Sequence, residues 1–268
     1  MAFFVLCRER GVRMECLSFV NFYGLPIVKS DREAVLTALR RALDVGRTFR
    51  VTTMNAQIAY YYLTMPEYQV ALKGTLVIPD GVGLSWAIRK RLNTRVSRFP
   101  GVELGFELCR LAGKSGESVF LFGSKPGVAE KAATFLAQET GVRIAGCRHG
   151  FHNPDEDTQL GICQEISESG ASILFVALGA PKQEIWLERF FEKTNARLGI
   201  GVGGSLDVWA GVVKRAPGWI QRMNMEWLYR ILQSPRKKFK VVFQLLKFIS
   251  IVNANGISGS IEEKRRFE

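Results

Sequence analysis

Cysteine and histidine are scarce in this chain of 268 residues, and their spacing predicts neither a metal site nor a disulfide framework. The five cysteines are scattered and form no CxxC pair, which is typical of free thiols in a reducing compartment. There are only two histidines, His149 and His152. No serine lies in a GxSxG motif, and so few histidines disfavour a hydrolase triad.

Long apolar runs and an export signal are also lacking. The apolar run Val241–Val252 holds 12 residues, whereas a helix that spans a bilayer needs about 20. The stretch Phe3–Leu6 is too short for the apolar region of a signal peptide, and charged residues follow it at once. A hydrophobic fraction of 47% is too high for a disordered chain. We therefore expect a cytoplasmic globular protein.

Positive charge is what the chain has in excess. Its formal net charge of +12 indicates an anionic partner: nucleic acid, lipid headgroups or a phosphorylated substrate. Between Lys214 and Lys247 there are nine basic residues and one acid, so this stretch alone carries +8. The sequence thus predicts a near-neutral body, residues 17–212, followed by a basic appendage, residues 213–268.

The appendage is apolar and aromatic as well as basic. Apolar residues recur at helical spacing from Trp219 to Leu232, which predicts one amphipathic helix. Pro235 interrupts it, and we expect a second helix whose polar stripe is Lys240, Gln244 and Lys247. Basic helices with a wide apolar face fit the interface of an anionic membrane. A helical pair packed on the body, with its basic face in solvent, fits equally well.

Short β-rich runs alternate with helical patterns through the body, which predicts an α/β fold: a Rossmann-like parallel sheet covered by helices. The predicted strands are Phe49–Thr53, Thr75–Pro79, Val119–Phe122, Arg143–Cys147, Ile173–Leu178 and Arg197–Val202. The predicted helices are Gln57–Leu63, Leu84–Arg91, Val128–Gln138, Thr158–Ser169 and Gln183–Phe191. Ligands of such sheets bind beyond the carboxyl ends of the strands, so the segments after strands are the candidate sites.

Two of these segments carry a carboxylate or glycines suited to a ligand. Asp80 follows a strand and is a candidate general base, although Asp-Gly after Pro is also a common turn. Gly201, Gly203 and Gly204 form a loop that either brings backbone N–H groups close to a phosphate or makes a tight turn.

Other polar residues in these segments have two interpretations each. Asp207 either binds ribose hydroxyls or caps the segment that follows. Thr53 and Asn55 are ligand-binding residues or helix caps, and Gln183 opens a helix whose positive end would face a ligand. The acidic run 155–157 matches a D-x-D metal motif, but an acidic first turn of a helix explains it better.

Each block alone is weak, but together and in order they closely resemble the WecG/TagA/CpsF family of bacterial glycosyltransferases. The blocks are Thr53–Asn55, Pro79–Gly83, Phe120–Gly127, Gly179–Glu184, Gly201–Gly204, Val213–Pro217 and Glu226–Arg230. The resemblance runs from about Leu17 to about Lys247, and the APKQE and EWLYR blocks are the most diagnostic.

The resemblance implies an inverting enzyme of cell-surface polysaccharide synthesis. It would move a sugar, of the N-acetylmannosamine type or a hexose, from a UDP-sugar to a polyprenyl-diphosphate-linked saccharide, without a metal or other cofactor. The resemblance also implies that the appendage docks on the anionic cytoplasmic face of the inner membrane, which makes the protein a peripheral membrane protein. We expect no nucleic-acid partner, and self-association into a homo-oligomer stays open.

The resemblance further implies residue roles. Asp80 would be the general base, and Asp207 would hold the nucleotide ribose beside the loop of Gly201, Gly203 and Gly204. The sugar-orienting residues would be Thr53, Asn55 and Gln183. The residues that neutralise the diphosphates would be Arg98, Lys214 and Arg230.

Two other function classes compete with the transferase. A nucleic-acid-binding α/β protein would use the basic, aromatic appendage to bind single or double strands. A nucleotide-dependent oxidoreductase would bind NAD, whereas the transferase would bind UDP.

Overall fold

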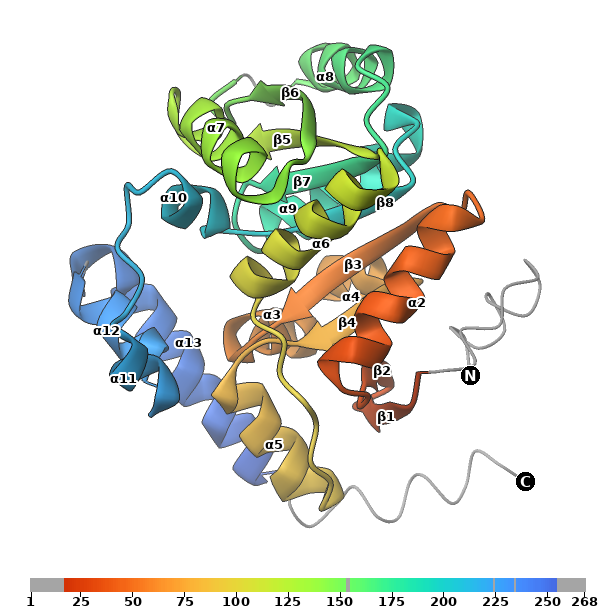
Figure 1. Ribbon diagram of the computed structural model, residues 1–268. Coiled ribbons are helices and arrows are strands. Elements are labelled where there is room, and N and C mark those ends of the chain that lie inside the picture. Colours follow the sequence, from red (N-terminus) through yellow and green to blue (C-terminus); the bar gives the residue numbers. More distant parts are fainter. Residues whose placement is uncertain (1–16, 153–154, 224, 234, 255–268) are drawn as a thin grey trace.

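An eight-stranded sheet lies at the centre of the computed structural model and confirms the α/β fold (Figure 1). The structure describes residues 17–152, 155–223, 225–233 and 235–254. The strands are β1 (Phe19–Phe22), β2 (Leu25–Val28), β3 (Phe49–Met54), β4 (Thr75–Pro79), β5 (Ser118–Gly123), β6 (Arg143–Arg148), β7 (Ile173–Ala177) and β8 (Leu198–Gly201). Their order in the sheet is β1-β2-β4-β3-β8-β7-β5-β6. Only β1 and β2 pair antiparallel, and the other neighbours are parallel.

Successive side chains along each strand point to opposite faces of the sheet, and the apolar ones form a hydrophobic layer on each face. In β7, for example, Ile173 and Phe175 face one layer and Leu174 and Val176 the other. The first face is covered by α2 (Arg32–Asp44), α6 (Gly101–Ser115), α7 (Val128–Thr140) and α10 (Ser205–Trp209). The second face is covered by α3 (Ala56–Thr64), α4 (Pro66–Leu72), α5 (Val82–Leu92), α8 (Glu156–Glu168), α9 (Lys182–Phe190), η1 (Phe191–Thr194) and part of α13 (Pro235–Ala254).

The six strands expected from the sequence correspond to β3–β8, and the five expected helices of the body to α3, α5, α7, α8 and α9. The sequence patterns did not predict β1, β2, α2, α4, α6, η1 or α10. A signal for α2 exists, because Asp31 caps it: its side chain accepts the Ala34 N–H at 2.9 Å, just before a run of apolar residues at helical spacing.

The single helix expected from Trp219 to Leu232 is wrong in one respect. The structure holds two short helices there, α11 (Gly218–Arg222) and α12 (Glu226–Gln233). The Met225 N–H donates to Ile220 O at 3.1 Å, a six-to-one bond that is typical of a helix end. The apolar periodicity continues across this break, so it could not reveal the break.

Helix α13 packs on the body through one face. Its Phe248 and Val252 are 1% and 0% exposed and belong to the apolar cluster that contains Met54 of β3. Gln244 accepts a hydrogen bond from Gln57 Nε2 of α3 at 2.9 Å, so part of the expected polar stripe faces protein. Figure 1 shows α13 beside α3 and α5. Within the described ranges, none of the helices combines the length and the apolarity needed to cross a membrane.

The packing of α13 predicts different costs for two phenylalanines on the same helix. Phe248→Ala removes a fully buried ring and should lower the free energy of unfolding by about 3–5 kcal/mol. Phe243 is 54% exposed, so Phe243→Ala should change it by no more than about 1 kcal/mol. Urea denaturation of both variants measures this. Equal costs would contradict the docked position of α13.

Candidate active site

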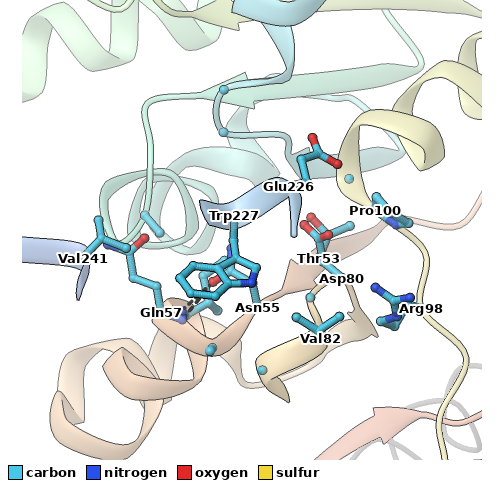
Figure 2. A pocket seen from close by; sticks show the side chains of 18 of the residues that line it. Thr53, Asn55, Gln57, Asp80, Val82, Arg98, Pro100, Glu226, Trp227 and Val241 are labelled. Carbon is cyan, nitrogen blue, oxygen red and sulfur yellow. Dashed lines mark hydrogen bonds between the residues drawn. The ribbon is translucent and has the colours of Figure 1, made fainter. Parts of the chain in front are cut away.

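A cavity of about 960 Å³ opens at the carboxyl ends of the central strands (Figure 2). Parallel pairing creates it: Thr52 of β3 lies opposite Val77 of β4 and Gly201 of β8, so the ends of all three strands meet at one edge. The cavity is lined by eight of the residues singled out from the sequence: Thr53, Asn55, Asp80, Arg98, Gln183, Gly201, Gly203 and Gly204.

Asn55 caps a helix and also lines the cavity. Its Oδ1 accepts the N–H groups of Gln57 and Ile58, at 2.9 and 3.1 Å, and so caps α3. These bonds occupy only the amide oxygen, and the side chain also lines the cavity. The cap therefore fixes the orientation of Asn55, so that its amide nitrogen is a donor in a defined position.

Asp80 lies on a short turn held against this cap. Its N–H donates to Met54 O at 2.8 Å, and α5 begins two residues later. The first turn of α5 approaches α3 so closely that a Cβ on Gly83 would lie 2.8 Å from Ala56 Cβ. Only glycine permits this contact, which brings the Asp80 carboxyl to the same cavity floor as Thr53 and Asn55 (Figure 2).

Gln183 holds the glycine loop, Gly201–Gly204, in place through a hydrogen bond. The Gly203 N–H donates to Gln183 Oε1 at 3.0 Å, and Gln183 Nε2 donates to Glu184 Oε1 at 2.7 Å. Gly203 has a φ of +51°, and a Cβ on Gly201 would lie 2.5 Å from Gln183 Nε2. The glycines are thus required by a positive φ and by the Gln183 side chain that fills the space beside the strand end.

Four charged residues absent from the predicted site also line the cavity: Arg32, Glu103, Arg215 and Glu226. Glu103 pairs with Arg32 Nη1 at 2.7 Å and with Arg215 Nη2 at 2.5 Å. Arg215 Nε also lies 3.9 Å from Glu226, and Arg32 Nε donates to the backbone oxygen of Arg98 at 3.0 Å. These side chains are 22–52% exposed, so each pair is worth no more than about 1 kcal/mol. Together they join α2, α6 and the appendage around the cavity.

Two predicted residues, Asp207 and Lys214, are not among the described residues that line the cavity, and the side chain of a third, Arg230, is not described. Asp207 lies beside the cavity: its Oδ1 accepts a hydrogen bond from Ser124 Oγ at 2.9 Å, at the carboxyl end of β5. Lys214 lies in the segment before α11. Arg230 lies in α12, but its side chain is outside the described residues.

One wall of the cavity is apolar and comes mainly from the appendage. Its members are Trp86 of α5, Trp227 of α12, and Val241, Val242, Leu245, Leu246 and Ile249 of α13. In Figure 2, Val241 and Arg98 lie on opposite sides of the view, with Trp227 between them. Amphipathic spacing revealed an apolar face on these helices, but not that part of this face lines a site.

The acidic run 155–157 is the start of a helix, as its alternative interpretation proposed. Asp155 caps α8, accepting the Thr158 N–H at 2.8 Å, and this bond lowers the pKa of Asp155. Glu156 and Asp157 form the first turn, where negative charge is favourable.

Comparison with known proteins identifies a family and a bacterial relative. Residues 20–260 match the model of the family described as "Glycosyl transferase WecG/TagA/CpsF family". The chain is also similar to the N-acetylglucosaminyldiphosphoundecaprenol N-acetyl-beta-D-mannosaminyltransferase of Bacillus subtilis (strain 168). The two are 31% identical over 218 residues, which cover 80% of this chain and 84% of that protein.

The close approach of Gly201 to Gln183 predicts the effect of one methyl group. Gly201→Ala should lower the free energy of unfolding by about 1–3 kcal/mol, because the Cβ has no room beside Gln183. Gly161, inside α8, has open space around it, so Gly161→Ala should raise this free energy by up to about 1 kcal/mol. Thermal denaturation distinguishes the two. An unaffected Gly201→Ala protein would refute the tight contact.

Proposed function

The chain belongs to the WecG/TagA/CpsF family of glycosyltransferases, and we propose that it transfers a sugar from a UDP-sugar to a polyprenyl-diphosphate-linked saccharide with inversion. The name of the Bacillus subtilis relative specifies an N-acetylmannosaminyl group and an undecaprenol-diphosphate-linked acceptor. The observation that carries the proposal is a single cavity with a polar floor and an apolar wall, which suits a sugar attached to a lipid. Family membership favours this function over a nucleic-acid-binding protein or an oxidoreductase.

In this proposal Asp80 is the general base. The acceptor hydroxyl gives its proton to the Asp80 carboxylate while its oxygen bonds to the anomeric carbon of the donor. The bond from that carbon to the UDP oxygen breaks, and UDP leaves with the electron pair, so one displacement inverts the centre. Among the described residues, the other carboxylates that line the cavity are Glu103 and Glu226, and both face Arg215. Asp80 directly follows strand β4 and lines the cavity with Asn55.

Basic side chains would stabilise the leaving diphosphate. Arg98, Arg32 and Arg215 line the cavity, and a guanidinium can bind two phosphate oxygens at once. We propose the same role for Lys214 and Arg230 from the family resemblance alone. Thr53, Asn55 and Gln183 would orient the sugars, and Asp207 would hold the ribose at the neighbouring strand end.

We also propose that the appendage lies on an anionic membrane. Phe243, Leu246 and Ile249 of α13 are 54%, 60% and 41% exposed, one turn apart along the helix. Lys240 and Lys247 are exposed on the same helix. Apolar side chains flanked by lysines suit the boundary between acyl chains and anionic headgroups. The lipid of the acceptor would then reach the cavity past its apolar wall.

Loss of the Asp80 charge tests the mechanism. Asp80→Asn should lower kcat by about 10²- to 10⁴-fold, because the amide cannot take the proton. Asp157→Asn makes the same chemical change on the exposed first turn of α8 and should leave kcat unchanged. The assay combines a panel of UDP-sugars with a lipid-diphosphate-linked N-acetylglucosamine acceptor. Near-normal transfer by a folded Asp80→Asn protein would exclude Asp80 as the base.

Vesicle binding tests the membrane proposal without removing α13, whose Phe248 and Val252 belong to the core. Replacing Phe243, Leu246 and Ile249 together by serine should weaken binding to anionic vesicles by at least about tenfold. The control replaces Val45, just after α2, and Val70 of α4, which are 59% and 56% exposed, by serine and should bind normally. Equal binding by both variants, measured by cosedimentation, would reject the α13 surface as the anchor.

A further inference from the structure

We propose that Glu184 is a positioning residue, which fixes the Gln183 carboxamide and through it the glycine loop Gly201–Gly204. Glu184 does not line the cavity itself and lies behind Gln183. It is 1% exposed, on the first turn of α9. The inference rests on the proposed function only for its effect on transfer.

A continuous chain of hydrogen bonds connects the carboxylate to the loop. Gln183 Nε2 donates to Glu184 Oε1 at 2.7 Å, and Gln183 Oε1 accepts the Gly203 N–H at 3.0 Å. The Gln183 side chain is only 3% exposed, and Gly201 leaves no room for it to move toward the strand. The amide plane is therefore fixed at both ends.

The negative charge of Glu184 determines which way round the amide lies. An ionised carboxylate only accepts hydrogen bonds, so it can pair with Gln183 Nε2 but not with Oε1. With Nε2 on Glu184, Oε1 must face the Gly203 N–H. In a Glu184→Gln protein the new side chain could donate to Oε1 instead, and the flipped amide would put its NH₂ group against the Gly203 N–H. Glu184→Gln thus keeps the shape of the side chain at position 184 but no longer determines the orientation of the Gln183 amide.

This arrangement is costly for folding. Burial raises the pKa of Glu184 to about 7, although the hydrogen bond from Gln183 and the nearby Tyr68 hydroxyl act in the opposite direction. The only other titratable group that faces this carboxyl among the described residues is Tyr68 of α4, which is fully buried. Glu184 Oε2 and the Tyr68 hydroxyl have no hydrogen bond of standard geometry to any described residue. A neutral glutamine would satisfy packing at lower cost, which suggests that the charge serves the site.

The pH dependence of this cost has a definite sign. The unfolded carboxyl ionises near its ordinary pKa of 4.5, and the folded one near 7. The folded state is therefore favoured by this group below pH 4.5, and that advantage is lost as the pH rises through 7. Glu184→Gln has no carboxyl at this position, so its stability does not fall in this way as the pH rises. The melting temperature of the variant minus that of the unaltered protein should therefore be larger at pH 8 than at pH 5.

The closing experiment combines loop exchange, kinetics and stability in one pair of variants. The test variant is Glu184→Gln, and the matched control is Glu188→Gln, the same change one turn along α9 at an exposed position. Hydrogen–deuterium exchange at pH 8 should accelerate in the peptide that covers residues 199–206, and elsewhere stay as before. The KM for the UDP-sugar should rise about tenfold with kcat within about twofold, because the loop holds the donor before and during reaction. Glu188→Gln should change none of these.

The outcomes separate the proposals. Unchanged exchange of the loop in Glu184→Gln would overturn the positioning role, whatever the kinetics. Faster exchange throughout the protein, with a lowered melting temperature at both pH values, would also overturn it in favour of a general structural role. Faster exchange confined to the loop supports the positioning role. If the unaltered protein transfers no sugar from any UDP-sugar in the panel, the proposed function fails while the positioning role stands.

Discussion

The parallel pairing of β3 with β4 and with β8 is the constraint on which the site depends. Because parallel strands end at the same edge, pairing brings Asn55, Asp80 and the glycine loop together from three separate parts of the chain. Each strand end then needs a tight turn, and the close contacts of Gly83 and Gly201 show how little space is left there. The cavity floor is thus made of residues that the sheet itself places, with short turns and caps fixing their orientation.

Helix α13 adds to this floor a wall of different chemistry. Phe248 and Val252 of this helix belong to the core, Val241, Val242 and Leu245 line the cavity, and Phe243 is exposed at the surface. Leu246 lines the cavity and is exposed as well. A single helix therefore connects the interior, the site and the surface. The division between a body and an appendage, drawn from the charge distribution, describes the electrostatics of the chain better than its packing.

The sequence was sufficient to predict the strand ends and the polar residues that follow them. Buried strands leave apolar runs, and Asp80, Asn55 and Gln183 come directly after such runs or open the next helix, so their common location followed from the fold class. Arg32 and Glu103 were out of reach, because they lie on helices that the sequence patterns did not predict and meet only through tertiary packing. The surface against which α13 packs was equally hidden, since an amphipathic pattern shows that a face is apolar without showing what covers it.

The role of Glu103 has a thermodynamic consequence. Two arginines from opposite ends of the chain share this one carboxylate, so part of the positive charge around the cavity is already neutralised within the protein. An anion that draws Arg215 away from Glu103 also weakens the bond that holds the start of the appendage to α6. Ligand affinity and the position of the appendage are then linked functions, and each must change the other by the same free energy.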